Sequence, residues 1–171
     1  MNVLQLKKQL TGRAQIPKVA EVRVRNFSGP RDIPVWADLI TAAFAAARPP
    51  VRRWSPAECE RRILQQPWWK AQRMWFTETN GDSQVVGTVT LGFRVGRNGS
   101  FPTIQWLAVL PGWRRLGVAR LLMAHLERFC WDAGFRQIHL ETHRDWREAG
   151  EFYQSLGYRM ICRPAMRTSP A

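Results

Sequence analysis

The stretch that most limits how this chain can fold runs from residue 103 to residue 133, where a strand pattern changes into a helical one. Residues 103–110, TIQWLAVL, form a short and mostly apolar run, which is typical of a buried strand. The turn PGW follows, and apolar residues then recur with the helical period at Val118, Leu121, Leu122, Leu126 and Phe129. The sequence therefore predicts a strand that turns directly into a helix over residues 115–133.

Positive charge and small residues coincide at the start of this helix. Arg114, Arg115 and Arg120 surround Gly117 and Ala119. A helix N-terminus exposes backbone N–H groups without intrahelical partners and carries the positive end of the helix dipole, so it favours anions. Small residues let a phosphate approach the backbone, and arginines add charge-assisted hydrogen bonds from the rim. The combination predicts a diphosphate-binding cradle. The alternative is that the small residues only permit close helix packing and the arginines form a solvated rim.

The rest of the chain predicts strands and helices in mixed order. Strands are expected at 21–27, 73–79, 84–95, 136–142 and 158–164, and helices at 32–44, 55–67 and 146–156. Asp32 is expected to cap the first helix, and Ser55 with Glu58 to form a capping box at the second. Hairpins combined with crossover connections indicate an α/β (α+β) domain on a mixed sheet.

The two ends of this pattern define the expected domain. Residues 1–20 are polar and basic without a sustained period, and Pro17 interrupts them. We therefore expect a poorly ordered basic leader over residues 1–20, and a single domain over residues 21–171.

Two motifs in the second half of the chain resemble the signatures of the GNAT superfamily of N-acetyltransferases. The first is Arg114-Arg115-Leu116-Gly117-Val118-Ala119, which follows a strand and opens a helix. The second is AGEFYQSLGYR, residues 149–159, which resembles the family's closing signature. The order and spacing agree over residues 103–160, whereas residues 21–100 agree only in the order of elements. One departure is Trp146, where many members carry Asn.

The resemblance implies a fold and a co-substrate. The fold is a mixed, mostly antiparallel twisted sheet with helices on both faces. In the family, the strand before the cradle splays from the strand after the helix, here residues 138–142, and the pantetheine arm of acetyl-coenzyme A lies between them. No metal is implied. The residues expected to contact the co-substrate are Leu107, Ala108, Val109, Arg114, Arg115, Leu116, Gly117, Val118, Ala119 and Arg120.

Two side chains are candidates for proton transfer during acyl transfer to an amine. An alkylammonium has a pKa of about 10.4, so a base helps to produce the neutral amine. Glu141 is the candidate base, because its separation from Tyr153 matches that of the acid–base pair in N-terminal acetylating members. The alternatives are that Glu141 only pairs with an arginine and that His143 is the base. Tyr153, whose phenol has a reference pKa of about 10, can lend a proton to the thiolate, unless it is only a core residue. A main-chain N–H near Val109 can polarise the carbonyl.

Two segments are expected to shape the acceptor pocket, RPPVRRW (residues 48–54) and QQPWWKAQRMW (residues 65–75). Arg52, Arg53, Trp68 and Trp69 favour an anionic or flat aromatic amine, either a small molecule or a peptide N-terminus. The alternative is that these tryptophans only cover the core.

Two other function classes are considered, and the net charge bears on the first of them. The 26 Lys and Arg residues against 13 Asp and Glu residues give a net charge of +13, which also allows a basic nucleic-acid-binding module. The charge is dispersed and no nucleic-acid signature is present, so we do not expect a nucleic acid partner. A second alternative is a non-catalytic coenzyme A-binding sensor or scaffold.

Cysteine and histidine placement gives no sign of a disulfide framework or a metal site. Cys59, Cys130 and Cys162 are widely spaced, and no CxxC pair occurs. The run HLETH could present His139, Glu141 and His143 to a metal, but strand histidines are more often bystanders. The sequence contains no apolar stretch long enough for a membrane span. We therefore expect a cytoplasmic monomer or homodimer without a membrane partner.

Overall fold

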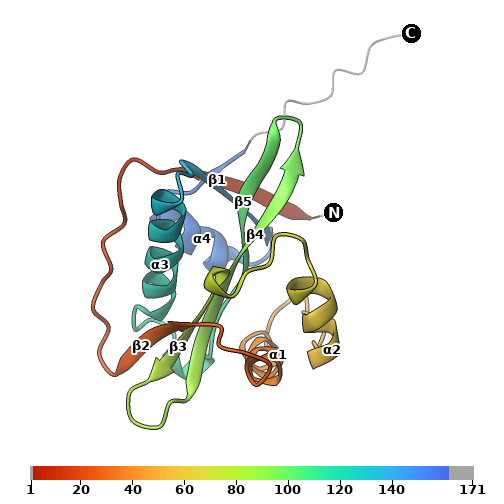
Figure 1. The fold of residues 1–171 in the computed structure, drawn as a ribbon, viewed down its shortest axis with the longest axis vertical. Coiled ribbons are helices and arrows are strands. Elements are labelled where there is room, and N and C mark those ends of the chain that lie inside the picture. The colour runs from red at the N-terminus through yellow and green to blue at the C-terminus, as the bar shows by residue number, and fades with distance from the viewer. Residues whose placement is uncertain (1, 162–171) are drawn as a thin grey trace.

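The structure, a computed structural model, describes residues 2–161, which form one seven-stranded sheet with helices on both faces (Figure 1). In chain order the elements are β1 (Val3–Gln9), β2 (Val22–Asn26), α1 (Asp32–Ala43), α2 (Pro56–Cys59), β3 (Met74–Thr79), β4 (Val85–Gly96), β5 (Gly99–Val109), α3 (Val118–Asp132), β6 (Gln137–His143), α4 (Arg147–Ser155) and β7 (Arg159–Met160). The strand order is β2-β3-β4-β5-β6-β1-β7. Neighbouring strands are antiparallel except β5 and β6. The predicted mixed, mostly antiparallel sheet is confirmed.

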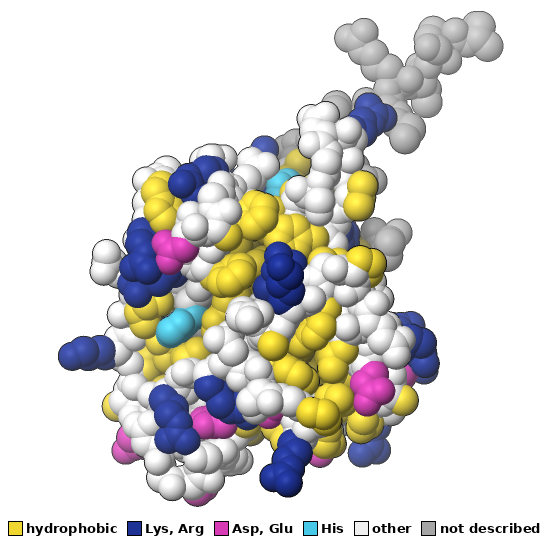
Figure 2. Space-filling model, viewed as in Figure 1, with side chains coloured by type: hydrophobic (Ala, Val, Ile, Leu, Met, Phe, Trp, Pro, Cys, Tyr) yellow, Lys and Arg dark blue, Asp and Glu magenta, His cyan; other side chains and the backbone are white. Residues whose placement is uncertain are grey.

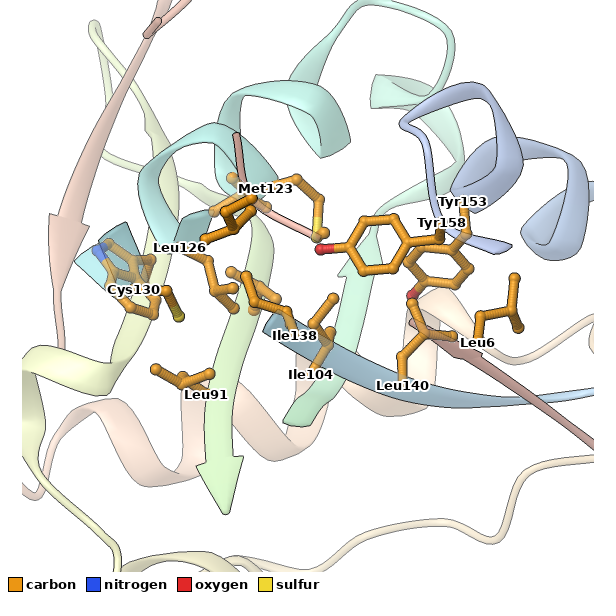
Figure 3. Close-up of a cluster of buried hydrophobic side chains, with 14 of the residues drawn as sticks. Leu6, Leu91, Ile104, Met123, Leu126, Cys130, Ile138, Leu140, Tyr153 and Tyr158 are labelled. Atoms are coloured by element: carbon orange, nitrogen blue, oxygen red, sulfur yellow. The ribbon is translucent and has the colours of Figure 1, made fainter. Parts of the chain in front are cut away.

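Two apolar clusters hold the helices against the sheet. The first joins α3 and α4 to the sheet and includes Leu122, Leu126, Ile138, Leu140 and Tyr158 (Figure 3). The second joins α1 and α2 to the opposite face through residues such as Trp36, Ile40, Trp54, Met74 and Phe76. Burial of these side chains supplies the main driving force for packing both layers.

Of the two helix caps predicted from the sequence, the structure confirms one. The capping box of Ser55 and Glu58 is present at α2, which continues as a π-helical turn to Leu64. The prediction that Asp32 caps α1 is wrong: Arg31 is the N-cap residue, and Asp32 opens the helix itself. Its carboxylate instead accepts hydrogen bonds from Arg25 and Ser28. The last strand, β7, is short, and residues 162–164 of the predicted strand lie outside the described residues.

The predicted poorly ordered leader contains β1, which lies between β6 and β7 and pairs with both. Leu6 is fully buried there. Residues 11–20, which we call the strap, then run along α3 (Figure 1). Arg13 forms two hydrogen bonds with Asp132, and Arg128 donates to the carbonyl of Ala14. Strand pairing on both sides and these strap contacts order the segment, and neither leaves a periodic pattern in the sequence.

Candidate active site

The turn between β5 and α3 has the conformation of an anion cradle. Arg115 and Gly117 are both in the left-handed region, with φ of 64° and 89°. Gly117 is the N-cap residue of α3, so the N–H groups of the first turn of α3 are directed into the turn. A Cβ at position 117 would lie 3.4 Å from a methyl group of Val19, an ordinary contact, so backbone conformation rather than space favours glycine there. The helix therefore begins at Val118, three residues later than predicted.

The strand before the cradle separates from β6, as the resemblance implies. β5 pairs with β6 only at Thr103 and Ile104, which face His139 and Leu140. A register shift between β4 and β5 follows, and Trp106 has a φ of 49° there. This is the geometry of a β-bulge, which bends a strand away from its neighbour.

The main chain of Val109 faces the gap that results. The N–H of Leu110 donates to Val86 of β4, and alternate residues of a strand form hydrogen bonds on opposite sides. The peptide groups of Val109 are therefore directed away from β4, toward the side of β6. The Val109 carbonyl accepts a hydrogen bond from the Nε atom of Arg114 at 3.2 Å. The N–H group of Val109 faces the gap on the same side of the strand.

A cavity of about 570 Å³ opens from this cradle between β5, the start of α3, α4 and the end of α1. Of the ten predicted contact residues, Leu107, Ala108, Val109, Arg114, Arg115, Gly117, Val118, Ala119 and Arg120 line it. Leu116 does not; its side chain points to solvent and is 56% exposed. Six residues that the sequence motifs do not predict also line the cavity: Ala43, Phe44, Trp113, Glu148, Glu151 and Ser155. Only Phe44 had a signal in the sequence, as an aromatic residue at the end of a predicted helix.

The three arginines of the cradle differ in their contacts. Arg114 donates to the carbonyls of Val109 and Ala43 at 3.2 Å and 2.5 Å. Arg120 donates to the hydroxyl of Ser155 at 2.9 Å and lies over the ring of Phe152. Among the residues that the structure describes, Arg115 has no hydrogen-bond or ion-pair partner, and its side chain is exposed at the cavity.

Tyr153 reaches from α4 into the apolar cluster at the cavity wall (Figure 3). The residue is 9% exposed, and burial raises the pKa of its phenol well above the usual range. Its ring contacts that of Tyr158 edge-on, with centroids 5.9 Å apart. The hydroxyl of Tyr158 donates to Glu127 at 3.0 Å, whereas Tyr153 makes no such bond within residues 2–161. The two tyrosines therefore differ in their surroundings: Tyr153 lines the cavity, and Tyr158 does not.

Glu141 is not one of the residues that line this cavity. It lies in a smaller pocket of about 70 Å³, where Arg94 and Gln5 contact its carboxylate at 2.5 Å and 2.9 Å. His143 of the same strand accepts a hydrogen bond from the Asp145 N–H and lies against Trp146. The structure thus brings Tyr153 and the cradle together and places both candidate bases on other contacts.

The histidines that could have held a metal are engaged elsewhere. His139 bonds to Gln137 at 3.0 Å and packs on Phe101. Within the described part of the chain, no three His, Cys, Asp or Glu side chains are placed to hold a metal ion.

Aromatic rings gather beside the cavity on the side of α1. Phe44 stacks on Trp146 with centroids 5.5 Å apart, and it contacts Trp106 edge-on at 6.0 Å. Trp106 in turn contacts Trp54 at 5.0 Å. The predicted acceptor residues Trp68 and Trp69 pack at the edge of the cluster under α1 and α2, and Arg52 pairs with Glu58. Position 146 is thus part of an aromatic wall.

Positive charge is dispersed on the face of the molecule shown in Figure 2. Figure 2 shows Lys and Arg side chains separated from one another over the face in view. Among residues 2–161, no helix is both long enough and apolar enough to cross a membrane.

Comparison with known proteins agrees with this geometry. The sequence model of the acetyltransferase (GNAT) family matches residues 37–158. No curated protein sequence matches the chain significantly. A GCN5-related N-acetyltransferase from Sphaerobacter thermophilus has a TM-score of 0.77 at 16% identity, over 93% of this chain and 48% of that chain. This chain therefore spans about half the length of that protein.

Two further solved structures carry ligands. An aminoglycoside N-acetyltransferase in complex with CoA has a TM-score of 0.65 at 16% identity, over 92% of this chain and 100% of that one. Arabidopsis thaliana Naa50, in complex with the bisubstrate analogue CoA-Ac-MVNAL, has a TM-score of 0.62 at 18% identity, over 84% and 86%. At these identities the likeness is one of fold.

Proposed function

Because the chain belongs to the GNAT family of acetyltransferases, we propose that it transfers the acetyl group of acetyl-coenzyme A to a primary amine by direct attack. The observation that supports this most strongly is the cavity that joins the cradle of α3 to Tyr153 along the end of β5, beyond the point where β5 stops pairing with β6. The cradle fits a diphosphate, because its N–H groups and Arg115 face one concave surface. Acetyl-coenzyme A supplies the activated thioester when bound.

The residues of the chain divide the work as follows. The amides of Val118–Arg120 and the side chains of Arg115 and Arg120 bind the diphosphate. The N–H of Val109 donates to the carbonyl oxygen, where negative charge develops as the C–N bond forms. Tyr153 donates a hydrogen bond to the sulfur as the C–S bond breaks. Since burial raises the pKa of Tyr153, the phenol keeps its proton at neutral pH and stabilises the thiolate mainly by sharing it.

Glu141 remains the proposed base that takes the proton of the attacking amine. This proposal is supported by the sequence, in which Glu141 lies twelve residues before Tyr153. The structure itself pairs the carboxylate of Glu141 with Arg94. A base in that position acts through water or after Arg94 moves. The proposed attack is direct, without a covalent enzyme intermediate: burial raises the pKa of Cys59 and of Cys130 to about 12 and keeps these two thiols protonated.

For the acceptor we propose an amine on a flat or apolar carrier, either a small molecule or a peptide N-terminus. The support is the aromatic wall of Phe44, Trp106 and Trp146: Phe44 lines the cavity, and the two tryptophans contact its ring. Cys59 and Cys130 are free and buried, which agrees with the proposed reducing, cytoplasmic setting and with a monomer or a homodimer.

A non-catalytic coenzyme A-binding domain is the second candidate, and the ion pair of Glu141 outside the cavity favours it. The two are separated by a screen of amines and peptide N-termini for thiol release from acetyl-coenzyme A, run beside calorimetry. Binding together with amine-dependent release supports the enzyme, whereas binding without release for every amine supports the sensor.

Gly117→Glu is the matched negative control for this screen. We expect it to abolish coenzyme A binding, because a carboxylate and a strained left-handed backbone would face the diphosphate. Leu116→Glu places the same charge one residue away on a side chain that points to solvent, and we expect near-normal affinity. Micromolar affinity retained by Gly117→Glu would contradict the proposed cradle.

A further inference from the structure

Arg114 is the first residue of the phosphate-binding signature, yet its guanidinium donates hydrogen bonds to two main-chain carbonyls. It bonds to the carbonyl of Val109 at the end of β5 and to the carbonyl of Ala43 at the end of α1. We propose that Arg114 is a positioning residue, which ties the C-terminal end of α1 to the end of β5 and so sets the aromatic acceptor wall against the reacting carbonyl. The inference rests on the proposed acetyl transfer and adds a role that the signature does not require.

The end of α1 needs such a partner. Ala43 is the last residue of α1, and the last four carbonyls of a helix have no intrahelical donor. The last turn of α1 contains no basic residue of its own. A guanidinium from the β5–α3 turn therefore supplies both the hydrogen bond and the positive charge that the negative end of a helix favours.

The shape of the guanidinium suits a link between two carbonyls. Its five N–H donors lie in one rigid plane, so two acceptors on different elements are held in a fixed relation. Both acceptors, Val109 and Ala43, belong to residues that line the cavity. A lysine at position 114 carries the same charge on a single nitrogen and cannot hold both carbonyls in that plane.

The hydrogen bonds of Arg114 set the position of Phe44 in the aromatic wall. Phe44 follows Ala43 directly, borders the cavity, and stacks on Trp146 at the start of α4. The N–H of Val109, on the other side of the link, is the proposed donor to the carbonyl oxygen. Arg114 thus fixes the amine side and the carbonyl side relative to each other, while Arg115 and Arg120 remain available to the diphosphate.

The test compares Arg114→Gln and Arg114→Lys with Arg115→Gln in the full chain, using the amine found by the thiol-release screen. For Arg114→Gln we expect the Kd of coenzyme A to stay within about threefold of wild type and kcat/KM for the amine to fall by about tenfold or more. For Arg115→Gln we expect the opposite: the Kd of coenzyme A rises about tenfold, and kcat/KM for the amine falls less than in Arg114→Gln. Arg114→Lys is expected to recover less than half of the lost activity. Arg97→Gln, at the tip of the β4–β5 hairpin, controls for the loss of one positive charge.

A double-mutant cycle shows whether Arg114 acts through Phe44. If it does, Phe44→Ala lowers kcat/KM for the amine, and the double variant is no worse than the poorer single variant. Hydrogen exchange gives a readout that needs no amine: Arg114→Gln should speed exchange at residues 44–47 and leave residues 121–126 unchanged. The proposal is overturned if Arg114→Gln weakens coenzyme A binding as much as Arg115→Gln while the KM for the amine stays constant, or if exchange at residues 44–47 does not change. Absence of thiol release by the wild type contradicts the proposed function instead. In that case the hydrogen-exchange result still shows whether Arg114 holds the end of α1 in place.

Discussion

At the scale of single residues, two neighbouring tyrosines show how similar burial serves different ends. Tyr158 belongs to a closed polar network, in which its hydroxyl and the Lys8 ammonium both donate to Glu127 at 3.0 Å and 2.7 Å. Tyr153 has the same kind of apolar surroundings but borders the cavity. Burial raises the pKa of both phenols, and for Tyr158 the charge of Glu127 adds to the rise. A substitution at each should therefore affect a different property.

We expect Tyr153→Phe to lower kcat by about 10- to 100-fold, because the departing thiolate loses a hydrogen-bond donor. The Kd of coenzyme A should change by less than about twofold, since the ring is kept. Tyr158→Phe is the matched control: it should lower the free energy of unfolding by about 1.5–3 kcal/mol through the lost bond to a charged group, with kcat unchanged. Steady-state kinetics, calorimetry and urea unfolding measure these effects. A normal kcat for Tyr153→Phe would leave that phenol a packing role only.

Glu141 can be tested against its own ion pair. If the carboxylate is the base, Glu141→Gln lowers kcat by about 100-fold, whereas Arg94→Met, which removes the partner and leaves the carboxylate, lowers it far less. If the pair only holds the strands together, both variants lower kcat and stability to the same extent. Rates measured from pH 6 to pH 9 with the same amine compare the two, and equal losses would contradict the role as base.

The sequence predicts the strand, turn and helix around the proposed cradle well, because these elements depend on local rules. A strand, a turn, a small residue at the helix N-cap and a helical period all lie within residues 103–133. The contacts of Arg114 with Ala43, of Phe44 with Trp146 and of Glu141 with Gln5 are different, because in each pair the partner lies more than 35 residues away in the chain. No local pattern encodes which distant carbonyl or carboxylate a side chain meets, so these contacts needed coordinates.

At the scale of elements, β1 shows the same limit of local reasoning. Its sequence VLQLKKQ alternates too briefly to be told from a polar leader, but its position between β6 and β7 supplies hydrogen bonds on both edges. Along its length it contributes Gln5 to Glu141, Leu6 to the core and Lys8 to Glu127. The contrast with α1 and α3 is physical: amphipathic helices carry their period in the sequence, whereas a strand paired on both sides depends on its neighbours.

The attachment of α1 to the sheet should depend on pH. Asp32 is buried, which by itself raises the pKa of its carboxyl, but hydrogen bonds from Arg25 and Ser28 outweigh this and lower the pKa below its usual value. A pKa lowered by folding stabilises the protein above the unfolded-state value of about 3.9, and this contribution is lost as the pH falls through the folded-state value. Asp32→Asn should therefore lower the free energy of unfolding by about 3 kcal/mol at pH 7, with a smaller difference from wild type near pH 2. Urea unfolding across this range, with the exposed Asp38→Asn as control, measures it. A difference that is constant with pH would contradict the assignment.

At the scale of the whole molecule, the chain carries an excess of 13 positive charges, and the proposed co-substrate is a polyanion. On the face shown in Figure 2 the Lys and Arg side chains are separated from one another, and the field of the net charge acts at long range and adds to the local effect of Arg115 and Arg120. A dispersed field speeds the encounter with an anion more than it holds the anion once bound. Association rates should therefore report the global charge, and dissociation rates the cradle.

We expect the association rate of coenzyme A to fall by about tenfold or more between 0.01 M and 1 M salt, because the Debye length shrinks from about 30 Å to about 3 Å. Neutral acetylpantetheine, which lacks the diphosphate, should associate at a rate that salt hardly changes. Arg115→Gln should raise the dissociation rate of coenzyme A and leave the salt dependence of association nearly as in wild type, since one charge in the excess of 13 contributes little to the long-range field. Stopped-flow measurements separate the two rates. Were the salt dependence to appear equally with acetylpantetheine, steering by charge would be excluded, and salt-sensitive binding of nucleic acid that acetyl-coenzyme A does not displace would instead support the nucleic-acid alternative.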